Sequence, residues 1–236
     1  ICEYNPLEAI KTNILGAQNV INSAINHNVE KVMAISSDKA VNPVNLYGAT
    51  KMCMEKLFVA ANFYVGEDRR TRMSCARYGN VLGSRGSVAA LFIKQKASGK
   101  VTITDRRMTR FWITLEQGVG FVIKSLEIMR GGEIFIPKIP SMKMLDFSKV
   151  IAPDCKIEYI GIRPGEKIHE CLLTEDESRH ALDFEGSFII EPEYQWRKIE
   201  SLKGAKSVPE GFRYASDKND RWLTAAELRQ MIGALD

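Results

Sequence analysis

The stretch that decides the fold runs from Lys31 to Lys51 and reads KVMAISSDKAVNPVNLYGATK. Its first six residues, 31–36, form a short apolar run rich in β-forming side chains, which predicts a buried strand. A loop containing Pro43 follows, and a long helix is expected from Tyr47 to about Val65. A strand that leads through a short loop into a long helix is typical of a parallel α/β sheet.

The alternation of strands and helices continues outward on both sides of this stretch. Apolar residues at helical spacing from Pro6 to about His27 predict a preceding helix, because proline suits a first helical turn. Further strands are expected at 73–78, 101–104 and 133–136, and further helices at 87–97, 115–129 and 223–235. Beyond Pro137 the expected elements become shorter.

We therefore predict an α/β fold that holds the C-terminal part of a Rossmann-type, doubly wound parallel sheet and a smaller α/β substrate domain. Residues 1–79 and about 115–137 are assigned to the back half of the nucleotide-binding domain, and about 80–114 and 138–236 to the substrate domain. The sequence has no G-x-G-x-x-G turn, so the glycine-rich first βα unit is expected upstream of Ile1.

Composition narrows the possible classes of partner. The 236 residues carry a net charge of +4, from 33 basic and 29 acidic side chains, without a long run of one sign, which argues against a nucleic-acid partner. Five widely spaced cysteines and three histidines favour reduced thiols and no metal site. No apolar run reaches the roughly 18 residues of a membrane span. A cytoplasmic protein is expected.

Tyr47 and Lys51 form a Tyr-x-x-x-Lys pair that would share one face of the predicted helix. A phenol titrates near pH ~10, and a nearby ammonium lowers that pKa, so the pair can accept a proton from a hydroxyl. Alone, such a pair is more often a surface contact. The adjacent pair Asp38-Lys39 would alone be a solvated loop pair. Its place directly after a hydroxyl residue and shortly before Tyr47 favours a catalytic role for the pair.

Several segments together resemble one family. The motifs SSDK and NPVNLYGATK (36–51), RYGNVLGSRGSV (77–88), ITDRRMTRFWIT (103–114), GGEIFIPKIPSMKM (131–144) and GIRPGEKIHE (161–170) occur in that order. They resemble the extended short-chain dehydrogenases that act on nucleotide sugars, and within them the 4,6-dehydratase branch that acts on UDP-N-acetylglucosamine and inverts C5. That branch carries Asp-Lys where other dehydratases carry Asp-Glu, and this sequence has Asp38-Lys39. Ser37 stands where threonine is more usual.

The resemblance implies NADP as cofactor and a UDP-sugar as substrate. The catalytic residues it implies are Ser37, Asp38, Lys39, Tyr47 and Lys51. It further implies cofactor contacts at Ser36, Tyr47, Lys51, Tyr78, Asn80 and Val81. Substrate contacts are implied at Asn80, Arg85, Thr104, Arg110, Arg163 and Glu166, with the diphosphate at Arg110 and Arg163 and the uridine ribose at Glu166. Asn13 is expected to brace the sheet, Trp112 to lie in the core, and His169 to have no catalytic role.

Three alternatives stay open. A nucleotide-sugar 4-epimerase would share Tyr47 and Lys51 but would not need Asp38-Lys39. A membrane-anchored, C5-retaining dehydratase would differ in an N-terminal extension. A non-catalytic dinucleotide-binding regulator would not need the Ser37, Tyr47 and Lys51 set. The resemblance also implies a homo-oligomer. It further implies a role in bacterial polysaccharide biosynthesis, for example in making the pseudaminic acid used in flagellin glycosylation.

Overall fold

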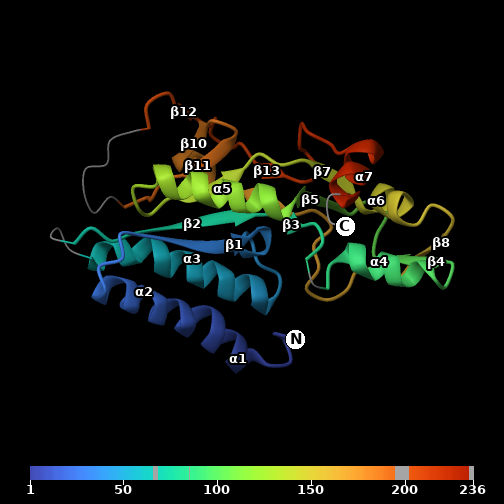
Figure 1. Ribbon diagram of the computed structural model, residues 1–236, viewed down its shortest axis with the longest axis horizontal. Helices are drawn as coiled ribbons and strands as arrows, with labels where there is room; N and C mark the ends of the chain where they lie inside the picture. Colours follow the sequence, from blue (N-terminus) through green and yellow to red (C-terminus); the bar gives the residue numbers. More distant parts are fainter. Residues whose placement is uncertain (66–68, 85, 195–201, 234–236) are drawn as a thin grey trace. The chain divides into compact units, whose positions relative to one another are not determined.

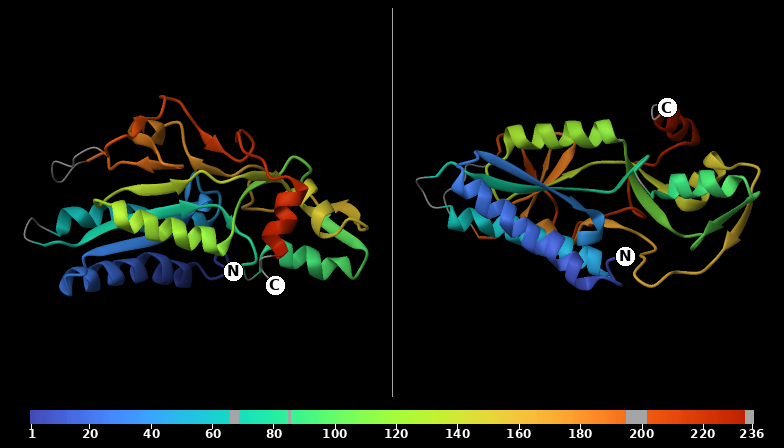
Figure 2. Two further views of the ribbon diagram at one scale, coloured as in Figure 1. Left: turned by 45° about the horizontal axis from the view of Figure 1, so that its top comes forward. Right: turned by 60° about the horizontal axis from the view of Figure 1, so that its bottom comes forward.

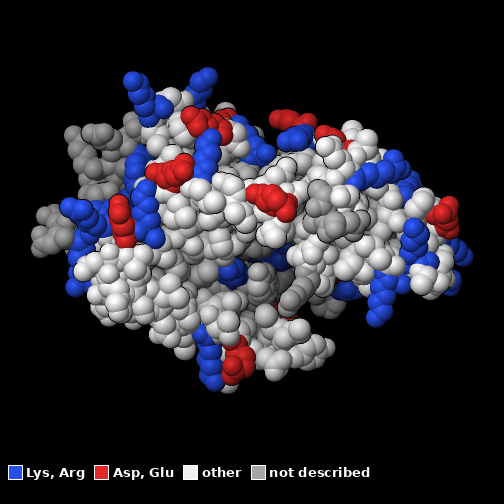
Figure 3. Space-filling model, in the orientation of Figure 1, with Lys and Arg blue, Asp and Glu red and all other residues white. Residues whose placement is uncertain are grey.

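The computed structural model describes residues 1–65, 69–84, 86–194 and 202–233 (Figure 1). The chain divides into two compact units. Unit 1 comprises Ile1–Tyr78, Gly120–Lys138 and Cys171–Arg213, and unit 2 comprises Gly79–Val119, Ile139–Glu170 and Tyr214–Asp236. On the face drawn in Figure 3, basic and acidic side chains are interspersed over the surface. Among the described residues, no helix is both long and apolar enough to cross a membrane.

A six-stranded sheet forms the centre of unit 1, in the order β1-β2-β6-β11-β10-β12. The parallel part consists of β1 (Lys31–Ser37), β2 (Arg72–Tyr78) and β6 (Ile134–Pro137). The antiparallel part consists of β11 (Ser187–Ile190), β10 (Ala181–Phe184) and β12 (Lys206–Ser207). The predicted parallel α/β sheet is confirmed. Cys171–Arg213, which the sequence assigned to the substrate domain, belongs to unit 1 because β11 pairs directly with β6.

Helices cover both faces of this sheet (Figure 2, right). One face carries α1 (Pro6–Ile10), the π-helical turn η1 (Lys11–Leu15), α2 (Gly16–Asn26) and α3 (Leu46–Tyr64), and the other carries α5 (Leu115–Ile128). The helix predicted from Pro6 to about His27 is therefore continuous but widened in its middle. Unit 1 also holds two 3-10 helices, η2 (Asp38–Ala40) and η3 (Glu177–His180), and the short strand β9 (Cys171–Leu173).

Polar side chains fix the register of α3 on β2. The Asn62 side-chain amide donates to the Met73 carbonyl (2.9 Å), and its oxygen accepts from the Met73 amide (3.0 Å). Two helical turns earlier, Glu55 accepts two hydrogen bonds from Arg77, at the other end of the strand. The helix and the strand therefore run in opposite directions. The first turn of α3 lies at the end of the sheet where β1 and β2 finish.

Unit 2 has its own small core. A three-stranded sheet has the order β3 (Asn80–Val81), β5 (Thr109–Ile113), β7 (Ser141–Lys143), and β4 (Lys100–Ile103) pairs in parallel with β8 (Lys156–Tyr159). The helices of unit 2 are α4 (Val88–Lys96), α6 (Met144–Ile151) and α7 (Ala225–Gly233), and the short strand β13 covers Tyr214–Ala215. Trp112 is fully buried and stacks on Phe147 with ring centroids 4.3 Å apart. Its predicted core role is confirmed.

Candidate active site

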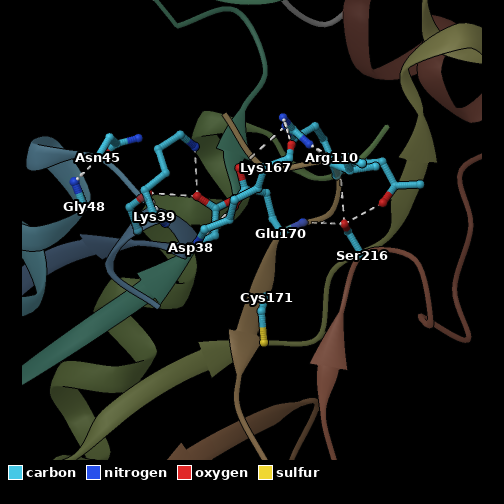
Figure 4. A network of polar contacts seen from close by, with 12 residues as sticks. Asp38, Lys39, Asn45, Gly48, Arg110, Lys167, Glu170, Cys171 and Ser216 are labelled. Atoms are coloured by element: carbon cyan, nitrogen blue, oxygen red, sulfur yellow. Dashed lines mark hydrogen bonds and ion pairs between the residues drawn. The ribbon is translucent and has the colours of Figure 1, made fainter. Parts of the chain in front are cut away.

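Ser37, Asp38 and Lys39 form one hydrogen-bonded group where β1 ends (Figure 4). The strand finishes at Ser37 in an extended conformation, and the chain then turns into η2. The Ser37 hydroxyl donates to Asp38 Oδ1 (2.9 Å) and accepts from the Lys39 amide (3.2 Å), so it caps the turn. The Lys39 ammonium donates to the same Oδ1 at 2.9 Å. Three adjacent residues that the sequence singled out are thus in direct contact.

The carboxylate at the centre of this group is withdrawn from water. Asp38 is fully buried, and its second oxygen, Oδ2, has no hydrogen bond to any described residue. The Lys39 side chain is 35% exposed, so it bridges this buried charge and the surface. A buried carboxylate needs a cation or hydrogen-bond donors, and Lys39 and Ser37 supply both. The remaining oxygen can accept a hydrogen bond from a bound ligand.

Tyr47 enters the site because α3 begins close to η2. The Asn45 side chain accepts from the Gly48 amide (2.8 Å) and so caps the helix, with Tyr47 in its first turn. A Cβ atom on Gly48 would lie 2.1 Å from the Lys39 carbonyl oxygen, which is a clash with the backbone. Only glycine therefore permits this approach of α3 to η2. Gly48 is a positioning residue that sequence reasoning missed, although it lies next to Tyr47.

The electrostatic surroundings of Tyr47 differ from the expectation. Burial raises the pKa of Tyr47 above its ordinary value, the Lys39 ammonium lowers it, and the Asp38 carboxylate raises it again. The sequence assigned the lowering of this pKa to Lys51. In the structure the ammonium that acts on the phenol is that of Lys39. Lys39 therefore influences both the buried carboxylate and the phenol.

Lys51 lies one turn further along α3. Its ammonium donates to the Ile35 carbonyl of β1 (2.6 Å) and approaches the Met54 sulfur at 3.4 Å. Burial lowers the pKa of Lys51, and the Glu55 carboxylate acts in the opposite direction and raises it. Asn13, expected to brace the sheet, instead donates to the Thr50 hydroxyl (3.0 Å) and braces α3 from the π-helical turn.

Two further residues of the predicted cofactor set lie in unit 1. Ser36 is only 3% exposed, and its hydroxyl has no hydrogen-bond partner among the described residues. Tyr78 ends β2 directly opposite Ser37 in the strand register. Burial, and then the charge of Tyr47, raise the pKa of Tyr78, so the two phenols lie within electrostatic range of each other. The end of β1 and β2 thus gathers the predicted residues of unit 1.

The other predicted contacts belong to unit 2. Asn80 and Val81 form β3, are partly buried, and pair with Trp112 and Ile113 of β5. Thr104 follows β4 and is partly buried. Arg85 lies outside the described residues. Cofactor contact at Asn80 and Val81, and substrate contact at Asn80, Arg85 and Thr104, remain predictions.

Arg110 is engaged within unit 2 and is 11% exposed (Figure 4). Its guanidinium donates to three main-chain carbonyls, those of Thr109 (2.7 Å), Ile168 (3.0 Å) and Lys167 (2.9 Å). Its Nε lies 3.7 Å from a carboxylate oxygen of Glu170. Arg110 therefore anchors the segment that follows Glu166. A contact with the diphosphate would require some of these donors to be shared.

The residues Arg163–Glu166 form a tight turn. The Glu166 amide donates to the Arg163 carbonyl (3.1 Å), Pro164 occupies the second position, and Gly165 has a φ of +77°. This is the arrangement of a type II turn, which requires glycine at its third position. Arg163 is 54% exposed, and its guanidinium lies 3.7 Å from Glu166 Oε1. The turn thus presents a cation to solvent beside a carboxylate.

Known proteins resemble this chain over most of its length. A family model described as "Polysaccharide biosynthesis protein" matches residues 1–192. The chain belongs to this family. It is 51% identical over 242 residues to the UDP-N-acetylglucosamine 4,6-dehydratase (inverting) of Campylobacter jejuni, covering 98% of this chain and 72% of that protein. It is 43% identical over 244 residues to a UDP-glucose 4-epimerase of Rickettsia canadensis, covering 100% of this chain and 70% of that protein.

A solved structure matches nearly the whole chain. The structure of Pen from Bacillus thuringiensis superposes with a TM-score of 0.89 at 42% sequence identity. The match covers 99% of this chain and 72% of that one. The structural match therefore includes residues of both units.

Several polar residues of this family member were not identified from the sequence as part of the site. The Ser216 hydroxyl accepts from the Glu170 amide (2.9 Å) and lies 2.7 Å from that of Thr109. Thr109 in turn lies 2.8 Å from His169 Nδ1, so His169 takes part in a structural chain of hydrogen bonds. No short-range motif marks Ser216, because it lies 46 positions after Glu170.

Proposed function

We propose that this chain carries the catalytic residues of a UDP-N-acetylglucosamine 4,6-dehydratase that inverts C5. The observation that carries the proposal is the contact of Ser37, Asp38 and Lys39, with Tyr47 inside their electrostatic field. A hydroxyl, a carboxylate, an ammonium and a phenol thus occupy one end of the sheet. The 51% identity to the inverting dehydratase of Campylobacter jejuni over 98% of the chain supports the same assignment.

The residues of unit 1 fit the nicotinamide end of a dinucleotide, which we propose to be NADP. The Ser36 hydroxyl is buried without a partner among the described residues, and the Lys51 ammonium lies at the strand end beside it. Lys51, Tyr47 and Tyr78 complete the proposed cofactor set of unit 1. Cofactor contacts at Asn80 and Val81 of unit 2 stay predictions from the sequence. When bound, the dinucleotide accepts a hydride from the sugar and later returns it.

Tyr47 takes the proton of the C4 hydroxyl in the first half of the reaction. Burial holds its pKa high, so proton transfer depends on a nearby positive charge, and Lys39 supplies that charge. Ser37 donates to or accepts from the same sugar hydroxyl and holds it in place. The O–H and C4–H bonds break together, and the product is a 4-keto sugar.

Lys39 and Asp38 carry out the second half as a pair. The new ketone acidifies the C5 proton. A proton that passes from Lys39 to Asp38 along their 2.9 Å contact leaves a neutral amine and a neutral carboxyl group. The amine then removes the C5 proton while the carboxyl group protonates the C6 hydroxyl, which leaves as water. Solvent then supplies a proton to the opposite face of C5, which completes the inversion and leaves Lys39 as an ammonium and Asp38 as a carboxylate.

The UDP group is proposed to bind in unit 2. Arg163 is an exposed cation on a rigid turn, and an arginine fork suits a diphosphate. Glu166 has a buried carboxylate oxygen without a hydrogen bond to the described residues, which suits a ribose hydroxyl donor. Arg110 is the proposed second diphosphate contact. Substrate contacts at Asn80, Arg85 and Thr104 are proposed from the sequence alone. A homo-oligomer is likewise proposed from the sequence alone.

The epimerase is the second candidate because of the 43% identity to the Rickettsia canadensis protein. The test is to incubate the protein that contains this chain with UDP-N-acetylglucosamine and to record proton NMR spectra. A new C6 methyl doublet is the expected result. A C4 epimer that keeps its C6 hydroxymethyl group would establish the epimerase instead.

A further inference from the structure

A largely buried group of charges joins α3, β2 and η3 within unit 1. The Arg77 guanidinium donates to both carboxylate oxygens of Glu55 (3.0 and 2.7 Å) and to both of Glu177 (3.2 and 3.0 Å). It also donates to the Leu172 carbonyl at 2.8 Å. Arg77 and Glu55 are each 2% exposed. We call these three charged residues the Arg77 cluster.

The cluster touches the site through the position of Glu55. Glu55 follows Lys51 by four residues on α3, a spacing at which a lysine and a glutamate normally pair. Here they do not form that pair. Arg77 occupies both Glu55 oxygens, and the Lys51 ammonium instead donates to the Ile35 carbonyl at 2.6 Å.

The Cys75 thiol, on the neighbouring strand β2, supplies no competing charge. Burial raises the pKa of the Cys75 thiol well above its ordinary value, so Cys75 is neutral near pH 7. The charge of Glu55 raises the pKa of Lys51, against the burial that lowers it. The two side chains are therefore close enough to interact.

We propose that Arg77 is a positioning residue that holds Glu55 away from Lys51, so that the Lys51 ammonium stays at the end of β1. Without Arg77, Glu55 would be a buried carboxylate that needs a new partner. Lys51, one helical turn away, is the cation that can reach it. Its capture would withdraw the ammonium from the Ile35 carbonyl. The catalytic consequence of this inference rests on the proposed function, because it matters only if Lys51 serves the reaction.

Four variants of the protein that contains this chain separate positioning from mere stabilisation. Arg77→Gln leaves Glu55 charged and able to capture Lys51. Glu55→Gln removes the capturing charge, and the double variant Arg77→Gln/Glu55→Gln removes both. Glu177→Gln is the matched control, because it removes a carboxylate from Arg77 while Glu55 stays paired.

The first readout is the titration of Lys51, followed by NMR of ¹³C-dimethylated lysines and assigned with Lys51→Arg. In Arg77→Gln the Lys51 resonance should titrate about one pH unit higher than in the wild type. In the double variant it should return to the wild-type value or below, and in Glu177→Gln it should not move. This readout needs no substrate, so it stands even if the proposed reaction is wrong.

The second readout is turnover per folded molecule. Arg77→Gln should lose at least about tenfold in kcat, and the double variant should recover most of the loss. If Arg77→Gln does not fold, Arg77→Lys, which keeps a cation but not the fork, should show a smaller shift in the same direction. An unchanged Lys51 titration in folded Arg77→Gln, or in Arg77→Lys where that variant replaces it, would overturn the proposal. So would a double variant that is no better than Arg77→Gln.

Discussion

Replacement of Lys39 by methionine tests the pairing on which the proposed mechanism depends. The variant keeps the length and apolar stem of the side chain and removes only the ammonium. Asp38 then remains fully buried with Ser37 as its hydrogen-bond donor among the described residues. We expect loss of proton transfer at C5, together with a moderate loss of stability.

The structure sets the size of the stability effect. Removing one partner of a buried ion pair costs about 3–5 kcal/mol. The Lys39 side chain is 35% exposed, so water replaces part of the lost interaction, and about 1–3 kcal/mol is expected. The kinetic effect should be larger, because a positioned general base contributes roughly 10²–10⁴ in rate.

The assay compares Lys39→Met with Lys56→Met, a matched change at an exposed lysine of α3. Both proteins are checked by thermal unfolding, and solvent deuterium incorporation at C5 is then followed by NMR. The pH dependence gives a second measure. Lys39 lowers the pKa of Tyr47, which must lose its proton to act as a base. Removal of Lys39 should therefore shift the rise of kcat/KM with pH to higher pH values. Wild-type exchange at C5 in folded Lys39→Met would refute the assignment of the base.

Three further predictions follow from single residues. Gly48→Ala should fold but lose at least about tenfold in kcat, because its new methyl group must displace the facing backbone carbonyl; circular dichroism and turnover test this. Burial acts to raise the pKa of Glu177, but Arg77 and the hydrogen bonds from Thr174 hold it below 4.5. The ionised carboxylate therefore stabilises the fold above that pH, and this contribution is lost as the pH falls further. The difference in unfolding free energy between the wild type and Glu177→Gln should accordingly shrink on acidification. Trp112→Ala should destabilise the protein by about 3–5 kcal/mol in urea unfolding, and a loss below about 1 kcal/mol would contradict its core role.

The local sequence pattern was sufficient to predict the parallel sheet and the candidate catalytic residues close to Tyr47. An apolar run predicts β1, and apolar spacing predicts the helix that follows it, because both patterns are set by neighbouring residues. Ser37, Asp38 and Lys39 are adjacent in the sequence, so a single turn brings them together. The proximity of adjacent residues can be predicted without knowing the tertiary fold.

Contacts between distant segments could not be read in the same way. The bonds from Arg77 to Glu55 and to Glu177 join residues 22 and 100 positions apart. The antiparallel strand β11 joins the sheet only because it pairs with β6, and no motif announces that pairing. The role of Gly48 depends on how closely α3 approaches η2, which is a matter of tertiary packing.

The most direct test of the central claim is the reaction of UDP-N-acetylglucosamine in D₂O with the protein that contains this chain. The account predicts a 4-keto-6-deoxy sugar of the L-arabino configuration that carries one deuterium at C5, because Lys39 removes the original proton and solvent supplies its replacement. A 6-deoxy product that keeps the original configuration at C5 would contradict the inverting mechanism. A product that retains its C6 oxygen would contradict the assignment as a dehydratase.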